Sequence, residues 1–404
     1  MITVLYITYT GLLDPLGQSQ VLQYTLALAR KGHRITVLSF EKADALADDK
    51  RVAALRAQCE AAGVSWHPRT WHKKPVSILA TLYDLVAGQR HAIRLAREVG
   101  ADVVHCRSYI AGLMGLAVKR ETRARFIFDM RGFWPDERVD GGSWSKSGLP
   151  YRFFKRAERR LFLGADHVVS LTRAGIREYE QFGYMKSVPP KSTVIPTCTN
   201  LHLFHPQHSA HEGFTLGYVG SVGSWYLFDM IAKVVARTFE LKPDARFLVV
   251  TKGNHGLVRD TLASEGVDLG RVELRSAEFS EVSTQIARMD AGVFFYRPTW
   301  SKLATSPTRL GEFLACGKPC LSNEGVGDIS ENLSETGTGI TLPASEAHNI
   351  DLSNLDESLS KLFTMASDPD IDTRCRAVAE ERFSLEGGVE AYSGIYRKLA
   401  SMPK

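Results

Sequence analysis

The chain has 404 residues, 44% of them hydrophobic and 24% charged, which is typical of a globular protein with two domains rather than one core. No run of about 18 apolar residues occurs, so no membrane-spanning helix is predicted. The six cysteines show no metal-ligand spacing, and we expect free thiols in a reducing cytoplasm. We expect no metal and no cofactor.

The net charge of +5 conceals an asymmetry between the two halves. Residues 1–206 carry 30 Lys and Arg against 18 Asp and Glu, whereas the rest of the chain carries 20 against 27. A basic first half suggests an anionic partner. DNA and RNA are disfavoured, because the basic residues are not part of a recognition motif.

Short apolar segments alternate with helical patterns through the first half, which predicts a parallel sheet covered on both faces. A segment rich in Pro, Ser and His, residues 187–214, is the expected connection, after which the alternation begins again. The expected strands are residues 1–8, 34–40, 102–105, 125–129, 167–171, 193–195, 215–219, 246–251, 271–274, 292–296 and 319–322. The expected helices include residues 19–31, 76–99, 151–163 and 386–400.

Two polar segments follow expected strands of the first half. Gly17 and Gln18 open the first helix after a turn-rich loop, and Asp129 and Arg131 follow the apolar strand 125–129. Polar residues after parallel strands emerge at the carboxyl edge of the sheet, where ligands bind. The same edge is expected to hold His105 and Arg107, and Trp134 and Trp144 are candidates either for stacking on sugars or for the core.

The expected helix at residues 151–163 is basic and amphipathic. Phe153, Phe154, Ala157 and Leu161 are expected to face inward, and Arg152, Lys155, Arg156, Arg159 and Arg160 outward. A solvated helix face and a surface that contacts an anionic membrane both fit this pattern.

The segment 306–319 carries the most specific pattern. Ser306 suits an N-cap, Pro307 the first helical position and Gly317 the position after the helix. A helix start favours an anion, because its free N–H groups and its dipole point there. Glu312, inside this helix, can accept hydrogen bonds from sugar hydroxyls. Phosphate and hydroxyl recognition together predict a nucleotide diphosphate-sugar.

This segment resembles the donor-site helix of the family 4 glycosyltransferases, which are retaining enzymes of the GT-B fold. The segments 17–20, 29–37, 165–172, 194–197 and 217–221 resemble further parts of that family in the same order. The resemblance implies two Rossmann-like domains: residues 1–195 for the acceptor, residues 196–385 for the nucleotide-sugar, and a helix at 386–404 that returns to the first domain.

The resemblance also implies a set of donor residues and two departures from the family pattern. Ser221 and the Trp225-Tyr226 pair stand where most members carry basic residues, and Ala304 stands where many carry a glutamate. Lys252 and Lys302 are the expected substitutes for the missing charge, with Arg297 and Arg309 weaker candidates. The expected donor residues are Gly220, Ser221, Lys252, Lys302, Ser306, Thr308 and Glu312; the acceptor residues are Gly17, Gln18, Asp129 and Arg131; the catalytic residues are Lys252, Asp129 and Arg131, acting electrostatically.

The expected activity is transfer of a sugar, with retention and without an essential metal, to a hydroxyl of a lipid-linked glycan in envelope polysaccharide synthesis. We expect a cytoplasmic protein that contacts the membrane peripherally. A non-hydrolysing sugar-nucleotide epimerase and a non-catalytic GT-B partner subunit remain alternatives. The sequence leaves the base, the sugar, the acceptor linkage and the oligomeric state open.

Overall fold

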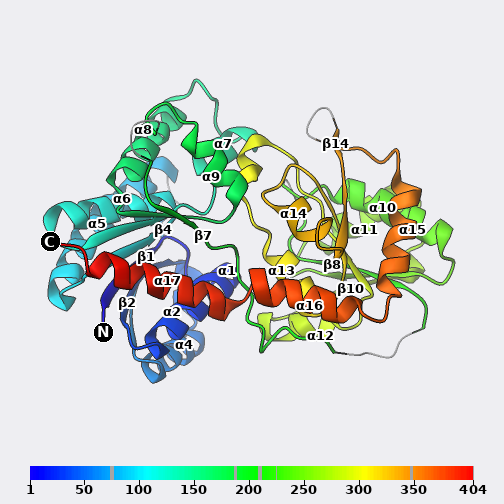
Figure 1. Ribbon diagram of the computed structural model, residues 1–404, viewed down its shortest axis with the longest axis horizontal. Coiled ribbons are helices and arrows are strands. Elements are labelled where there is room, and N and C mark those ends of the chain that lie inside the picture. Colours follow the sequence, from blue (N-terminus) through cyan, green and yellow to red (C-terminus); the bar gives the residue numbers. More distant parts are fainter. Residues whose placement is uncertain (73–76, 186–188, 208–211, 224, 346–348, 404) are drawn as a thin grey trace. The chain divides into compact units, whose positions relative to one another are not determined.

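The computed structural model describes residues 1–72, 77–185, 189–207, 212–223, 225–345 and 349–403. The chain divides into two compact units, which we call unit 1 (residues 1–196 and 385–404) and unit 2 (residues 197–384) (Figure 1). Five parts of the segments expected from the sequence lie outside the described residues. These are residue 76 of an expected helix, residues 187–188 and 208–211 of the expected connection, Ser224 of the polar loop expected after the strand at 215–219, and residue 404 of the segment expected to return to the first domain.

Unit 1 is built on a seven-stranded sheet in the order β3-β2-β1-β4-β5-β6-β7, and all neighbouring strands are parallel. Because the order reverses between β1 and β4, the residues after these two strands lie at a topological switch point, where open α/β sheets bind ligands. The strands are β1 (Thr3–Thr8), β2 (Arg34–Glu41), β3 (Val64–Thr70), β4 (Val103–Arg107), β5 (Arg125–Asp129), β6 (His167–Ser170) and β7 (Ser192–Val194).

The sequence missed β3 and anticipated the other six strands. β3 is the edge strand and contains Pro68 among polar residues, which lowers its strand signal. An edge strand tolerates a proline because one row of its N–H groups needs no partner in the sheet.

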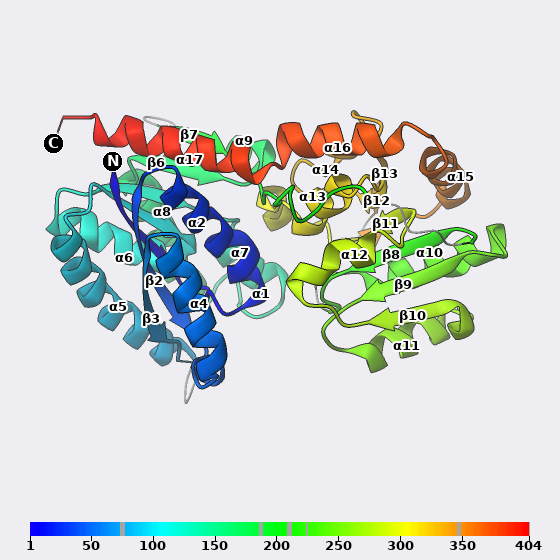
Figure 2. The same cartoon turned by 90° about the horizontal axis from the view of Figure 1, so that it is seen from below.

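Helices cover both faces of this sheet; Figure 2 shows α2 and α4 on one face and α5 and α6 on the other. The first expected helix starts as a short turn and a π-helix before it becomes α2. The helices of unit 1 are α1 (Pro15–Gly17), η1 (Gln18–Leu22), α2 (Gln23–Arg30), α3 (Ala43–Leu46), α4 (Asp49–Ala61), α5 (Ser77–Val99), α6 (Ser108–Glu121), α7 (Trp134–Asp140), α8 (Leu149–Gly164), α9 (Arg173–Glu180) and α17 (Leu385–Ala400).

The last helix, α17, belongs to unit 1 although it follows unit 2 in the chain. It packs on α2, and Lys31 pairs with Glu390 across that contact. Tyr392 and Tyr396 of α17 are buried, and the Tyr396 hydroxyl lies 2.7 Å from His105 Nδ1 at β4. These contacts fix the C-terminal helix to the sheet of the first unit.

Two of the inward and outward assignments on α8 are wrong. Phe153 is 47% exposed. Lys155 bridges Asp136 and the buried Glu158, so its charge is used inside the unit. The remaining basic residues of the expected outward face are exposed, namely Arg152, Arg156, Arg159 and Arg160.

Unit 2 has a six-stranded parallel sheet in the order β10-β9-β8-β11-β12-β13, with its own switch point between β8 and β11. The sequence missed β13, and a short antiparallel pair, β14–β15, stands apart from the sheet. The strands are β8 (Thr215–Val219), β9 (Arg246–Val250), β10 (Val272–Arg275), β11 (Ala291–Val293), β12 (Cys320–Asn323), β13 (Gly339–Leu342), β14 (Ala344–Ser345) and β15 (Asn349–Ile350).

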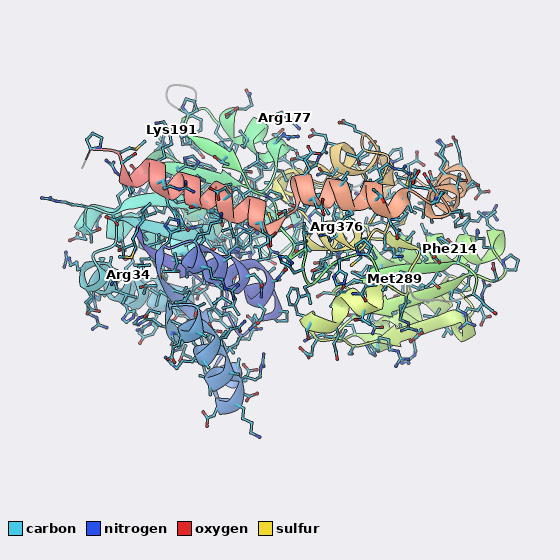
Figure 3. All side chains as sticks on the ribbon, turned by 60° about the horizontal axis from the view of Figure 1, so that its bottom comes forward. Arg34, Arg177, Lys191, Phe214, Met289 and Arg376 are labelled. Carbon is cyan, nitrogen blue, oxygen red and sulfur yellow. The ribbon has the colours of Figure 1, made fainter. Side chains whose placement is uncertain are left out.

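Close approaches hold the helices of unit 2 in place. Gly217 of β8 leaves room for Met289, whose Sδ would lie 2.0 Å from a Cβ at that position. Arg376 of α16, labelled with Met289 in Figure 3, donates to backbone carbonyls of Leu201, Phe204 and Ala315. The helices are α10 (Phe228–Leu241), α11 (His255–Ser264), η2 (Leu269–Arg271), η3 (Phe279–Glu281), α12 (Val282–Ile286), η4 (Trp300–Ala304), α13 (Thr308–Ala315), α14 (Ile329–Leu333), α15 (Leu355–Ala366) and α16 (Ile371–Arg382).

Candidate functional site

The start of α13 differs by one residue from the expected geometry. Pro307 is the N-cap, the helix begins at Thr308, and Gly317 after its end has φ +78°, as expected for the C′ position. The Ser306 hydroxyl does not cap the helix. Thr197 holds Ser306 instead, because its backbone N–H donates to Ser306 Oγ (3.3 Å) and its hydroxyl to the Ser306 carbonyl (2.9 Å). The loop before α13 is therefore fixed.

Glu312 lies on the second turn of α13 and is 9% exposed. Burial raises the pKa of its carboxyl to about 7, and the neighbouring Arg309 opposes that rise. A carboxyl group that is half ionised near neutral pH is unusual for a helix surface and typical of a functional site. The carboxylate form can accept hydrogen bonds from the hydroxyls of a bound sugar.

Arg309, one turn before Glu312, is a cation that the sequence ranked below Lys252 and Lys302. Its side chain is 6% exposed, its Nη1 has no hydrogen-bond partner, and no carboxylate of the described residues forms an ion pair with it. Four aromatic rings surround the guanidinium, with their centroids 4.5–5.9 Å from Cζ: Tyr218, Tyr226, Phe294 and Tyr296. Cation–π contacts keep this charge tolerable inside the unit without neutralising it.

The glycine loop after β8 lies directly against Arg309. Gly220 has φ +124°, and a Cβ added there would lie 2.4 Å from Arg309 Nη2. Any other residue at 220 would displace the guanidinium or strain the backbone. The neighbouring Ser221 is exposed, and its carbonyl accepts a hydrogen bond from the Tyr218 hydroxyl (2.5 Å). The loop, a buried cation and the start of α13 thus come together, as an anion site requires.

The two lysines expected to replace the missing basic residues have different environments. Lys252 follows β9, is half-exposed and pairs with Glu278 at 2.6 Å. Lys302, in η4, is 6% exposed, and its Nζ lies 3.9 Å from the ring centroid of Trp225. Ala304 is fully buried. Arg297 is exposed.

Unit 1 holds a second cluster of buried charges at the ends of β4 and β5. Arg107 and Asp129 are register partners on these strands. Asp129 is 1% exposed, lies 3.7 Å from Arg131 Nη1, and accepts a hydrogen bond from the Tyr392 hydroxyl (3.1 Å). Burial raises the pKa of Asp129, but Arg131, His105 and Arg107 together lower it below its ordinary value. The carboxylate therefore stays charged and positions Arg131 rather than reaching the surface of unit 1.

Arg107 and Arg131 have groups left unsatisfied in this cluster. Each Nε lacks a hydrogen-bond partner, and the side chains are 6% and 8% exposed. Arg131 has a φ of +61° and Ser108, which follows Arg107, has a φ of +71°; both values are rare for residues with a Cβ. Strained backbone of this kind clusters at functional sites.

Gly17 and Gln18 have structural contacts. A Cβ at Gly17 would lie 1.8 Å from the Gly11 carbonyl oxygen, so only glycine allows the two backbone segments to approach. Gln18 donates its side-chain N–H to the Leu12 carbonyl (2.7 Å), and Glu41 accepts from the N–H groups of Leu12 and Leu13. The first loop is thereby closed by its own hydrogen bonds.

Among the described residues, no helix combines the length and apolar character that crossing a membrane demands. No group of three or more His, Cys, Asp or Glu side chains within the described ranges could hold a metal ion.

Two Rossmann-like units with parallel sheets define the GT-B class of fold. Residues 17–198 match the model of the glycosyl transferase 4-like domain family. That segment is similar to this family, and the chain as a whole has the GT-B fold. No curated protein matches it significantly.

Solved structures share the fold over the entire chain at low identity. A glycosyltransferase from Rickettsia africae is 13% identical, with 100% of this chain and 99% of that chain covered and a TM-score of 0.72. HepE from Anabaena in complex with UDP-glucose is 15% identical (98% and 100% covered; TM-score 0.69). WaaG, a glycosyltransferase involved in lipopolysaccharide biosynthesis, is 15% identical (98% and 99% covered; TM-score 0.63).

Proposed function

We propose that the protein transfers a sugar from a nucleoside diphosphate-sugar to a hydroxyl of a lipid-linked glycan, with retention of configuration, in the synthesis of an envelope polysaccharide. Unit 2 binds the donor and unit 1 the acceptor. The observation that carries this proposal is Arg309, a buried cation between the Gly220 loop and Glu312 that forms no ion pair with a carboxylate of the described residues. The UDP-glucose of HepE and the lipopolysaccharide role of WaaG support the donor class and the pathway class by analogy.

The diphosphate of the donor occupies the space beside Gly220, with Arg309 and the start of α13 supplying positive charge. Glu312 accepts hydrogen bonds from hydroxyls of the nucleotide ribose. Lys302 is the second cation of this site, and Lys252, whose charge is already paired with Glu278, contributes less. Ser221 and Thr308 bind phosphate oxygens through their backbone N–H groups, as free groups at loops and helix starts do; Ser306 holds the loop in place.

In the reaction, the bond between the anomeric carbon and the phosphate oxygen breaks while the acceptor oxygen bonds to the same face of the sugar. The acceptor proton passes to the departing diphosphate, so no protein nucleophile and no metal is required. Arg309 stabilises the charge that grows on the leaving group, an effect typically worth about 10²–10³ in rate for one preorganised donor. Asp129 and Arg131 act in unit 1, with Asp129 holding Arg131 toward the acceptor.

The test is thermal unfolding of the wild type and of Glu312→Ala with UDP, GDP, dTDP, ADP and CMP. One nucleotide at 100 times its Kd stabilises the wild type by about 2.7 kcal/mol and stabilises the variant far less. Glu324→Ala, an exposed glutamate after β12, is the matched control and should behave as the wild type. An absence of any shift in the wild type contradicts the donor site.

Nucleotide binding alone does not separate a transferase from a non-catalytic subunit. Incubation with the stabilising nucleotide's sugar conjugates and a membrane lipid extract gives a glycosylated lipid if the proposal is correct. Release of a 2-epimerised sugar nucleotide without a glycosylated lipid would instead support the epimerase, and binding without any turnover would support the non-catalytic subunit.

A further inference from the structure

Unit 1 contains a large apolar cavity that the donor site does not use. Its volume is about 870 Å³, within the range of roughly 300–1,000 Å³ for ligand pockets. The wall is mostly aromatic and aliphatic, and it includes Phe40, Trp71, Ile110, Trp134, Trp144 and Phe154. A sugar ring alone would leave most of such a wall without a partner.

The inner end of the cavity is cationic. Arg107 and Arg131 line it with the unsatisfied Nε atoms described above. Arg107 has one long contact, 3.5 Å from Nη1 to Thr10 Oγ1, and no ion pair among the described residues. Burial lowers the pKa of Arg107, and the charge of Arg131 lowers it further. One carboxylate, Asp129, thus serves two buried guanidinium groups, and an anion would supply the missing charge.

The outer end of the cavity opens among exposed apolar side chains. Leu82 of α5 and Leu149 and Phe153 of α8 line it and are 41%, 79% and 47% exposed. The exposed arginines of α8, among them Arg152 and Arg156, lie on the same helix. A long apolar chain could leave the cavity over these residues toward a lipid surface, where basic side chains favour anionic headgroups.

We propose that this cavity binds the acceptor as an amphiphile, with a phosphate group on Arg107 and Arg131 and a hydrocarbon chain along the aromatic wall. The proposal rests on the proposed function, since it names the chemical class of its acceptor. Guanidinium suits a phosphate because its planar fork binds two oxygens at once. Arg107 ends β4, and positive φ values at Arg131 and at Ser108, the residue after Arg107, mark the backbone on which the two guanidinium groups are held. The other polar pair at the cavity, Lys42 with Asp14, is already matched in charge.

Farnesyl phosphate, farnesol and inorganic phosphate are the probes, each titrated onto the full chain. Tryptophan fluorescence reports binding, because three tryptophans line the cavity: Trp71, Trp134 and Trp144. Farnesyl phosphate should bind at least about tenfold more tightly than farnesol and than inorganic phosphate. If farnesol binds as tightly as farnesyl phosphate, the cavity has no phosphate site. If inorganic phosphate binds as tightly as farnesyl phosphate, the aromatic wall does not bind the hydrocarbon chain. Either result would overturn the proposal.

Two pairs of variants locate the ligand. Arg107→Gln should weaken farnesyl phosphate binding at least about tenfold and leave farnesol binding unchanged, whereas Arg123→Gln, which is exposed between α6 and β5 and outside the cavity wall, should alter neither. Leu149→Asp should weaken both farnesyl ligands, whereas Leu163→Asp, exposed on the same helix and outside the cavity wall, should not. Leu149 is exposed, so its variant should fold even if Arg107→Gln does not. If Leu149→Asp and Leu163→Asp bind the farnesyl ligands with the same affinity, the proposal is wrong.

Further experiments distinguish this proposal from a membrane-binding surface and from a part of the donor site. Anionic vesicles without farnesyl phosphate should not give the Arg107-dependent fluorescence change; if they do, the site is a membrane surface and not a cavity. If Arg107→Gln weakens nucleotide binding as well, the arginine belongs to the donor and the proposal fails. Farnesyl phosphate binding without any nucleotide binding would refute the proposed function and leave the cavity assignment standing.

Discussion

Each unit buries arginine side chains, and the two units compensate the buried charge in different ways. In unit 1, Asp129 compensates Arg131 through an ion pair and leaves Arg107 without one. In unit 2, four aromatic rings surround Arg309, and no described carboxylate pairs with it. A carboxylate offsets part of the charge that the arginines beside it carry, whereas aromatic rings leave the whole charge of Arg309 to an incoming anion. We therefore expect loss of Asp129 to reduce stability and loss of Arg309 to reduce activity.

The largest expected effect is that of Asp129→Asn. The variant leaves Arg131 and Arg107 buried without a counterion, which typically costs about 3–5 kcal/mol of unfolding free energy. Urea denaturation measures the loss. Asp136→Asn is the matched control, since its partner Lys155 keeps an ion pair with Glu158. A loss below 1 kcal/mol would show that the cluster does not hold unit 1 together.

Arg309→Gln should have the opposite effect to Asp129→Asn, reducing activity more than stability. We expect kcat/KM for the donor to fall about 10²–10³-fold with a much smaller loss of stability than in Asp129→Asn, because rings rather than ion pairs surround the charge. Steady-state kinetics and urea denaturation measure the two quantities. Arg297→Gln, exposed before η4, should match the wild type. A loss of stability without loss of activity would make Arg309 a framework residue.

Glu312 gives the pH dependence of the donor site. Its folded pKa of about 7 lies above the ordinary 4.5, so the folded state binds more protons between these values. Its contribution to stability is therefore fully present below about pH 4.5 and is lost as the pH rises through 7, by roughly 3 kcal/mol in total. Denaturation at pH 5 and 8 should show that the difference in unfolding free energy between the wild type and Glu312→Gln changes with pH.

The same ionisation should affect ligand binding in the opposite direction. Ribose hydroxyls donate to the carboxylate, so nucleotide affinity should rise between pH 6 and 8 in the wild type and stay flat in Glu312→Gln. Calorimetric titration at each pH measures the nucleotide affinity. A wild-type affinity that is independent of pH would separate Glu312 from the ribose.

The smallest effect should be that of Gly220→Ala, which displaces Arg309 by less than its removal does. We expect about a tenfold loss of kcat/KM for the donor. Gly223→Ala is the control, because Gly223 also has a positive φ (+148°) but no atom within 4 Å of an added Cβ. If both variants lose the same activity, the backbone strain and not Arg309 is responsible.

The sequence pattern predicted most strands, because strands of a sheet that is covered on both faces are continuous apolar segments. It missed β3 and β13, each an edge strand of its sheet, since half-buried edges mix polar and apolar residues. It also placed Phe153 inside, because helical periodicity indicates which residues share a face but not where the neighbouring elements end.

The sequence by itself determined the class of fold, the glycine loop, the helix at 308–315 and its glutamate, since all of these depend on local spacing. Only the tertiary structure showed which candidate cation is buried against the glycine loop. Arg309 is one turn from Glu312 in sequence, but the rings around it come from β8, the loop that follows β8 and the segment after β11, and Gly220 in the loop after β8 lies against it. The cavity with Arg107 and Arg131 was likewise invisible, because its walls join elements far apart in the chain. Burial, and with it the value of a charge, depends on which distant segments pack around a residue.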